Sequence, residues 1–191
     1  MLYGAPTARR RDAQRNRAAI LEAASEVLAG GDVVALMPEI ARRAGVGQAT
    51  LYRHFADRHA LLAAVLSYQL DLLDARVVAH AQHPAEFRSL LREVLHHQIE
   101  MRGLVSLVRR LEPAVQERYR QRVIAAFAVP LRRAREHGYV RADLVPEDLA
   151  LLLTMVQGVT EAAADVAAAR AAADRSIDLM LDGVFRAGAA D

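Results

Sequence analysis

The residues best suited to chemistry lie in one short stretch, PEIARRAGVGQATLYRHF, at positions 38–55. Gln48 can pair with adenine through two hydrogen bonds, while Ala49 and the ring of Tyr52 can meet thymine methyl groups. Side chains that can hydrogen-bond phosphates lie among them, namely Thr50, Tyr52, His54 and Arg53, of which Arg53 can also read a base. This pattern predicts noncovalent recognition of a DNA major groove.

The local pattern also predicts how these groups are positioned. Apolar residues recur at helical spacing within 40–44, and Gly45 then ends that helix. A second helix is expected to begin at Gly47 and to turn Leu51 and Phe55 inward, four residues apart. This is a helix-turn-helix pattern, although spacing alone also allows an ordinary helical hairpin with a solvated polar face.

The complete string resembles the DNA-binding domain of the TetR family of bacterial regulators. The family signature runs IA..AGV....LY.HF and is followed by a basic residue, here Arg58. The resemblance implies DNA binding, with Arg58 on a phosphate. The chain departs from the family where the first helix of the motif commonly opens with a Thr or Ser cap, because Leu36 cannot accept a capping hydrogen bond. Arg42 and Arg43, or backbone N–H groups, are therefore the expected phosphate ligands there.

Composition narrows the class of protein. The chain has 191 residues, of which 53% are hydrophobic, and charges interrupt its apolar stretches before they reach membrane-spanning length. It contains no cysteine, which excludes disulfides and thiolate chemistry, and no secretory leader is evident. We expect a soluble, cytoplasmic protein that associates with the nucleoid and not with a membrane.

Positive charge concentrates near the helix-turn-helix pattern. Residues 1–60 carry nine arginines against six acidic residues, whereas the remainder carries 16 against 17. All 25 basic residues are arginine, which fits GC-rich coding as well as a functional demand. Five of them precede or open the first expected helix: Arg9, Arg10, Arg11, Arg15 and Arg17. Such an arm can follow phosphates or enter a minor groove, or it can be a disordered, solvated tail.

The rest of the chain shows helical periodicity without competing strand-like alternation. Helices are expected over about 14–29, 57–79, 87–102, 104–111, 113–137, from 146 onward and over 171–186. We predict an all-α fold of about nine helices. Its three parts are an arm and helix-turn-helix head (1–57), a linking helix (58–83), and an effector-binding and dimerisation domain (84–191).

The last two expected helices have broad apolar faces and small residues that allow close helix approach: Gly158, Ala162, Ala163 and Gly183. Burial within one chain would explain the same pattern. The resemblance implies instead a homodimer formed through these two helices. Two recognition helices about 34–36 Å apart would then read a near-palindromic double-stranded operator.

The resemblance also implies a small-molecule effector site in the C-terminal domain, although no readable motif marks it. Candidate lining residues combine bulk or a polar tip with apolar helix faces: Tyr68, His97, Met101, Tyr119, Val123, Phe127, Met155 and Gln157. Each residue could instead be part of the core, and packing is the favoured interpretation for any one of them. Their mixture suggests a mostly apolar organic effector with one or two hydrogen-bonding groups.

Two other classes of function remain open at this stage. A helical enzyme could use His96, His97 and Glu100, although no HExxH pattern, catalytic triad or phosphate loop accompanies them, so we expect no catalysis, metal or cofactor. A ligand-binding or adaptor protein that has lost DNA binding would explain the apolar segment of Leu36, Met37 and Pro38. The leading hypothesis is a ligand-responsive, DNA-binding repressor.

Overall fold

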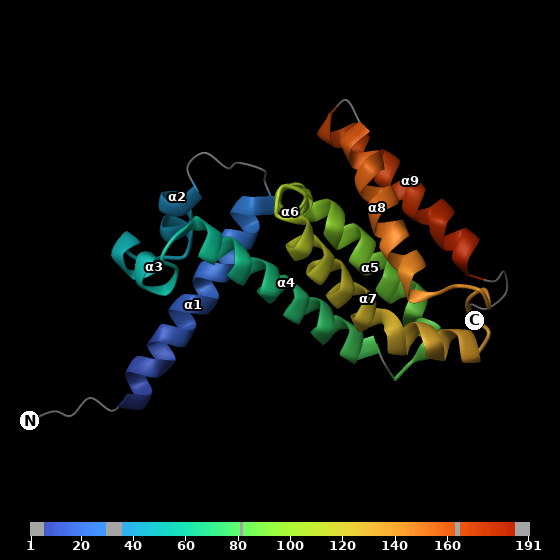
Figure 1. Cartoon of the computed structure of the whole chain (residues 1–191), viewed down its shortest axis with the longest axis horizontal. Helices are drawn as coiled ribbons and strands as arrows, with labels where there is room; N and C mark the ends of the chain where they lie inside the picture. The colour runs from blue at the N-terminus through green and yellow to red at the C-terminus, as the bar shows by residue number, and fades with distance from the viewer. Residues whose placement is uncertain (1–5, 30–35, 81, 163–164, 186–191) are drawn as a thin grey trace, which may run out of the picture. The chain divides into compact units, whose positions relative to one another are not determined.

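The computed structural model describes residues 6–29, 36–80, 82–162 and 165–185. Within these ranges the chain forms nine α-helices and one 3-10 turn and no extended strand, which confirms the all-α prediction (Figure 1). The helices group into two compact units, residues 1–69 and residues 70–191, with the division inside α4 (Arg58–His80).

The first unit contains α1 (Pro6–Ala29), α2 (Leu36–Arg43), α3 (Gln48–His54) and the first half of α4. Its core is built from one face of each helix, and the fully buried members include Ile20, Ile40, Leu51 and Leu61. One polar contact is buried with them, because Gln69 donates a hydrogen bond of 2.9 Å to the Ser25 hydroxyl. That hydroxyl in turn donates to the backbone of its own helix, so its hydrogen-bonding groups are satisfied.

The first helix is longer than predicted. It begins at Pro6, eight residues before the expected start at Gln14, so the described arginines of the expected arm are helical and not in an extended tail. Pro6 suits the first helical position, where a missing N–H costs nothing. The sequence prediction placed the boundary where apolar periodicity begins, and residues 10–15 have none because every one of them is exposed.

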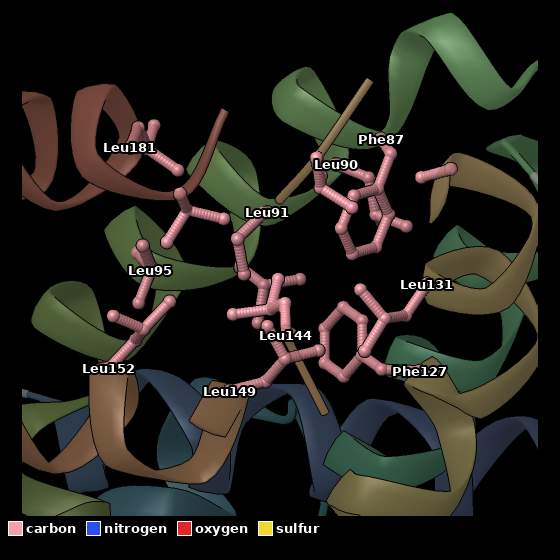
Figure 2. Packing of buried hydrophobic residues seen from close by; sticks show 14 of the residues in the cluster. Phe87, Leu90, Leu91, Leu95, Phe127, Leu131, Leu144, Leu149, Leu152 and Leu181 are labelled. Atoms are coloured by element: carbon pink, nitrogen blue, oxygen red, sulfur yellow. The ribbon is translucent and has the colours of Figure 1, made fainter. Parts of the chain in front are cut away.

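The second unit contains the rest of α4, then α5 (Phe87–Glu100), α6 (Arg102–Val108), α7 (Pro113–Glu136), α8 (Pro146–Ala162) and α9 (Val166–Val184). A 3-10 turn, η1 (Pro84–Glu86), precedes α5. Helix α5 packs on α7, α8 and α9, and its leucines meet Phe127 and Leu131 of α7 in a continuous apolar core (Figure 2). Phe87 and Phe127 are the largest side chains that are almost completely buried.

The starts of two helices in this unit differ from the prediction. Helix α9 starts at Val166 and not near Ala171, because the Asp165 carboxylate accepts a hydrogen bond from the backbone N–H of Ala168 at 2.8 Å and caps the helix. Helix α6 starts at Arg102 and includes Gly103, which was expected to separate two helices. The predicted end of α9 at Arg186 lies outside the described residues, as does Ala163.

Three polar contacts join α5 to α9 along one seam, and two of them are ion pairs. The Arg88 guanidinium lies 2.6 Å from the Asp182 carboxylate, the Arg92 guanidinium lies 2.7 Å from Asp178, and His96 lies 3.4 Å from Asp174. The hydrogen bond from Arg92 lowers the pKa of Asp178. Because the partners step by four residues in opposite directions on the two helices, the seam fixes one antiparallel register between them.

Candidate nucleic-acid interface

The turn between α2 and α3 is built around Gly45, whose φ of +64° lies in the left-handed region. The backbone N–H of Gly45 donates to the carbonyl of Arg42 at 3.2 Å, and the N–H of Val46 donates to the carbonyl of Ala41 at 3.0 Å. This pair of bonds is a Schellman motif, which satisfies the last carbonyls of α2 and turns the chain sharply. The glycine that the sequence marked as a helix end is therefore required by its backbone conformation.

Helix α3 begins directly after this turn, and side chains on one of its sides pack into the core. Gly47 is its N-cap in an extended conformation, and the Gly47 carbonyl accepts hydrogen bonds from Thr50 and Leu51. Leu51 is completely buried, and Phe55, which caps the C-terminus, is nearly so. The Arg17 guanidinium of α1 lies 5.4 Å from the centre of the Phe55 ring and covers it by a cation–π contact. Helix α3 is thus fixed by its two inward side chains.

The outward side of α3 carries the residues that were predicted to read bases. Gln48, Ala49 and Arg53 are exposed, and Tyr52 exposes 49% of its surface although it is large and partly apolar. Thr50 and His54 are half-buried at the flanks of this face. The side chain of Arg53 donates a 3.0 Å hydrogen bond to the Thr50 hydroxyl, which leaves the hydroxyl proton available to a phosphate oxygen.

The arginines of α2 are less available than the sequence suggested. Arg42 binds the Glu39 carboxylate through two hydrogen bonds of 2.7 and 2.8 Å, and Arg43 adds a third at 2.7 Å. These bonds lower the pKa of Glu39 to about 2, so the carboxylate is ionised and offsets one of the two positive charges. Arg58, by contrast, is exposed at the start of α4 beside Asp57, whose side chain caps that helix by accepting from the N–H of Ala60.

The predicted effector residues do not all come together. Tyr119, Val123 and Phe127 lie on α7 against the core of the second unit, and Met101 is buried at the junction of α5 and α6. On α8, the side chains point elsewhere: Met155 exposes 54% of its surface, and Gln157 donates to Glu161 at 2.9 Å. Tyr68 is half-buried in the first unit.

His97 has a more specific environment. Its Nδ1 lies 3.5 Å from the Arg76 guanidinium of α4 and 3.6 Å from the Glu100 carboxylate. Burial and, secondarily, the charge of Arg76 lower the pKa of His97, which favours the neutral imidazole near pH 7. Burial also raises the pKa of Tyr119, so its phenol stays protonated and can donate a hydrogen bond.

Sequence reasoning did not identify Gln98. Its side-chain N–H donates to the carbonyl of Leu153 on α8 at 2.8 Å, whereas its buried Oε1 has no hydrogen-bond partner among the described residues. A buried unpaired acceptor costs stability, and a ligand donor would remove that cost. Nothing in the local sequence indicates this, because it depends on the approach of two helices 55 residues apart.

The three residues considered for an enzyme site do not converge. His96 faces Asp174 on α9, whereas His97 faces Arg76 on α4. Across the described ranges, no group of three or more His, Asp or Glu side chains is arranged to hold a metal ion. No helix in those ranges is long and apolar enough to cross a membrane.

Two helices joined by a sharp turn, the second with one side buried in the core and a polar outer side, form the arrangement of a helix-turn-helix protein. Residues 20–65 match the model for bacterial regulatory proteins of the tetR family, and residues 83–186 match the model for the C-terminal domain of SbtR-like transcriptional regulators. The chain belongs to the TetR family of DNA-binding transcriptional regulators, a family of regulators and not of enzymes.

Relatives agree with this assignment. The chain is 35% identical over 95 residues to the HTH-type transcriptional repressor LfrR of Mycolicibacterium smegmatis, a match that spans about half of each protein. A TetR transcription regulatory protein from Mycobacterium vanbaalenii has a TM-score of 0.72 at 28% identity, covering 93% of this chain and 99% of its own. The TetR transcriptional regulator SCO0520 from Streptomyces coelicolor has a TM-score of 0.71 at 28% identity, covering 90% and 99%.

The outward face of α3 leads to a prediction about base reading. Replacing Gln48 by Ala should cost about 1–3 kcal/mol of binding at one operator base pair and relax the preference there, because a two-bond contact to a base is lost. Replacing Arg58 by Ala should weaken binding to all sequences to a similar extent. Affinities for operators substituted one base pair at a time measure both effects, and an unchanged preference in Gln48→Ala would remove Gln48 from base readout.

Proposed function

We propose that the protein is a homodimeric repressor that binds a near-palindromic operator through α3 and is regulated by a small organic effector. The observation that carries the proposal is the exposed face of Gln48, Ala49, Tyr52 and Arg53 on a helix fixed by Leu51 and Phe55. Repression is supported by the relative from Mycolicibacterium smegmatis, which is a transcriptional repressor.

Base readout is assigned to Gln48, Ala49 and Tyr52, with Arg53 as a further candidate. Thr50, His54 and Arg58 contact phosphates. Arg42 and Arg43 have a secondary role, because both already bind Glu39 and must share their donors with a phosphate. Major-groove side chains supply sequence preference and phosphate contacts supply most of the affinity.

Dimerisation through α8 and α9 is supported by a matching surface on the two helices. On α8, Leu151, Met155, Gly158 and Ala162 share one exposed stripe, and on α9 the stripe consists of the exposed Ala172, Leu179 and Gly183 together with the half-buried Ser176. Leu151 and Leu179 expose 60% and 56% of their surfaces. A Cβ at either glycine would meet nothing within 4 Å in its own chain, so another helix has room to approach there. Both stripes have the spacing of helix-packing seams.

The effector site is proposed for the second unit, around Tyr119 and His97. The phenol of Tyr119 offers a hydrogen-bond donor, and the neutral imidazole of His97 offers a donor or an acceptor. The unpaired oxygen of Gln98 offers a further acceptor. These groups fit a mostly apolar molecule with a few hydrogen-bonding atoms. Helix α4 belongs to both units, so a ligand that prefers one position of α4 shifts DNA affinity, and operator DNA shifts ligand affinity by the same factor.

The experiment that tests DNA binding uses the purified protein and the DNA flanking its own coding region. Binding is measured from 50 to 200 mM salt against a scrambled duplex of equal length. We expect selective binding that weakens about 10³-fold or more over this range, because each contacted phosphate releases counterions. An adaptor that has lost DNA binding would show little affinity even at 50 mM, which would contradict the proposal.

The dimer surface is tested by a charge placed on its stripe. Leu151→Asp should convert the dimer to monomers at micromolar concentration, because an unpaired carboxylate would be buried between chains. Val78→Asp is the matched control, since Val78 exposes 70% of its surface on α4, outside the proposed interface. Mass by sedimentation distinguishes the outcomes, and a wild-type monomer, or a Leu151→Asp dimer of wild-type strength, would exclude this interface.

A further inference from the structure

The N-terminal half of α1 is a charged surface that the helix-turn-helix function does not explain. Residues 10–15 are all exposed, and the first buried side chain among those that the structure describes on this helix is Ile20. Residues 10–17 carry four arginines and a single acid, Asp12, which pairs with Arg15. Among the described residues, Arg10 and Arg11 are not within ion-pair distance of a carboxylate. This segment therefore contributes charge to the surface but no burial to the head.

The position of this surface follows from its own helix. Arg17 lies over Phe55, which caps the C-terminus of α3, so this side of α1 faces the recognition helix. Arg10 precedes Arg17 by seven residues, which is two helical turns, and it therefore lies on nearly the same side, about 10 Å farther along the axis. Arg11 follows Arg10 and lies about 100° around the helix from it. The Arg10 guanidinium thus extends the basic surface beyond the end of α3, and the exposed Arg11 widens that surface around α1.

The residues at the start of α1 do not favour a helix in isolation. A polar segment of this length has little helical stability of its own, and neighbouring arginines repel one another. The repulsion is relieved when a polyanion neutralises the arginines. The segment offers alanines but no large apolar side chain on any face, so it lacks what an amphipathic helix needs to enter a lipid surface. The DNA backbone, with its regularly spaced phosphates, matches these guanidinium groups better than a lipid surface does.

We propose that Arg10 and Arg11 bind backbone phosphates that flank the bases contacted by α3, which makes the start of α1 a second, sequence-independent DNA contact. This inference rests on the proposed DNA-binding function. It enlarges the operator footprint on each side without adding base preference. It also assigns a role to a helical extension that the core of the head does not require.

The test compares two operator duplexes, one trimmed to the base pairs that determine selectivity and one extended by six base pairs of arbitrary sequence on each side. Wild-type protein should bind the extended duplex more tightly. In Arg10→Ala/Arg11→Ala the gain should disappear, and the slope of log affinity against log salt should become shallower by about two per protomer. Alanine favours the helix, so loss of folding does not explain such a result.

Two matched variants complete the design. Arg110→Ala/Arg118→Ala removes the same charge from exposed positions of the second unit and should keep the wild-type slope. Arg10→Lys/Arg11→Lys keeps the charge and should keep most of the gain. An unchanged salt slope in Arg10→Ala/Arg11→Ala, with selective binding intact, overturns this inference but not the proposed function. The same holds if Arg110→Ala/Arg118→Ala lowers the salt slope as much as Arg10→Ala/Arg11→Ala does. Absence of selective binding by every protein, wild type included, overturns the proposed function as well.

Discussion

Burial of Leu51 and Phe55 is the constraint on which the DNA-binding head depends. Helix α3 has only seven residues and would not persist alone, so its stability comes from packing. Burying each of these side chains contributes about 1.5–3 kcal/mol. Because both point to one side, Ala49 and Arg53 point to the other, and Tyr52 lies at the edge of that face with 49% of its surface exposed. The same packing that forms the helix therefore exposes the residues proposed to read DNA.

The turn before α3 determines where that exposed face lies. Gly45 takes a left-handed conformation, and the two Schellman hydrogen bonds fix the backbone between α2 and α3. The contact of Arg17 with Phe55 joins α1 to the far end of α3. A helix held at its start by a turn and at its end by a ring contact presents its side chains in a preorganised arrangement, which lowers the entropy cost of binding.

Local features of the head could be read from the sequence, and long-range ones could not. The turn at Gly45 and the inward residues Leu51 and Phe55 depend on neighbours within a few positions, and the structure confirms them. The predicted start of α1 was wrong because the exposed first part of the helix has no apolar periodicity in its sequence. The start of α9 was wrong because the capping role of Asp165 was overlooked, although the residue type allows it.

The second unit shows the same limit more strongly. The polar contacts between α5 and α9 join residues 78 to 94 positions apart, and the unpaired oxygen of Gln98 exists only where α5 meets α8. Neither follows from periodicity, which predicts the apolar face of a helix but not the helix that packs against that face. Choosing effector residues by bulk and polarity consequently mixed core side chains such as Phe127 with exposed ones such as Met155. Those assignments remain predictions.

The most direct test of the central claim is a thiol footprint on α3. The chain contains no cysteine, so Ala49→Cys places a single thiol on the outward face, and Val78→Cys provides a control on α4. Alkylation rates are measured with operator DNA, with a scrambled duplex and without DNA. We expect operator DNA to slow alkylation at residue 49 about tenfold or more, because a tenfold protection corresponds to a complex favoured by about 1.4 kcal/mol. Alkylation at residue 78 should be unchanged. Equal reactivity at residue 49 in a protein bound to its operator would contradict the claim that α3 enters the groove.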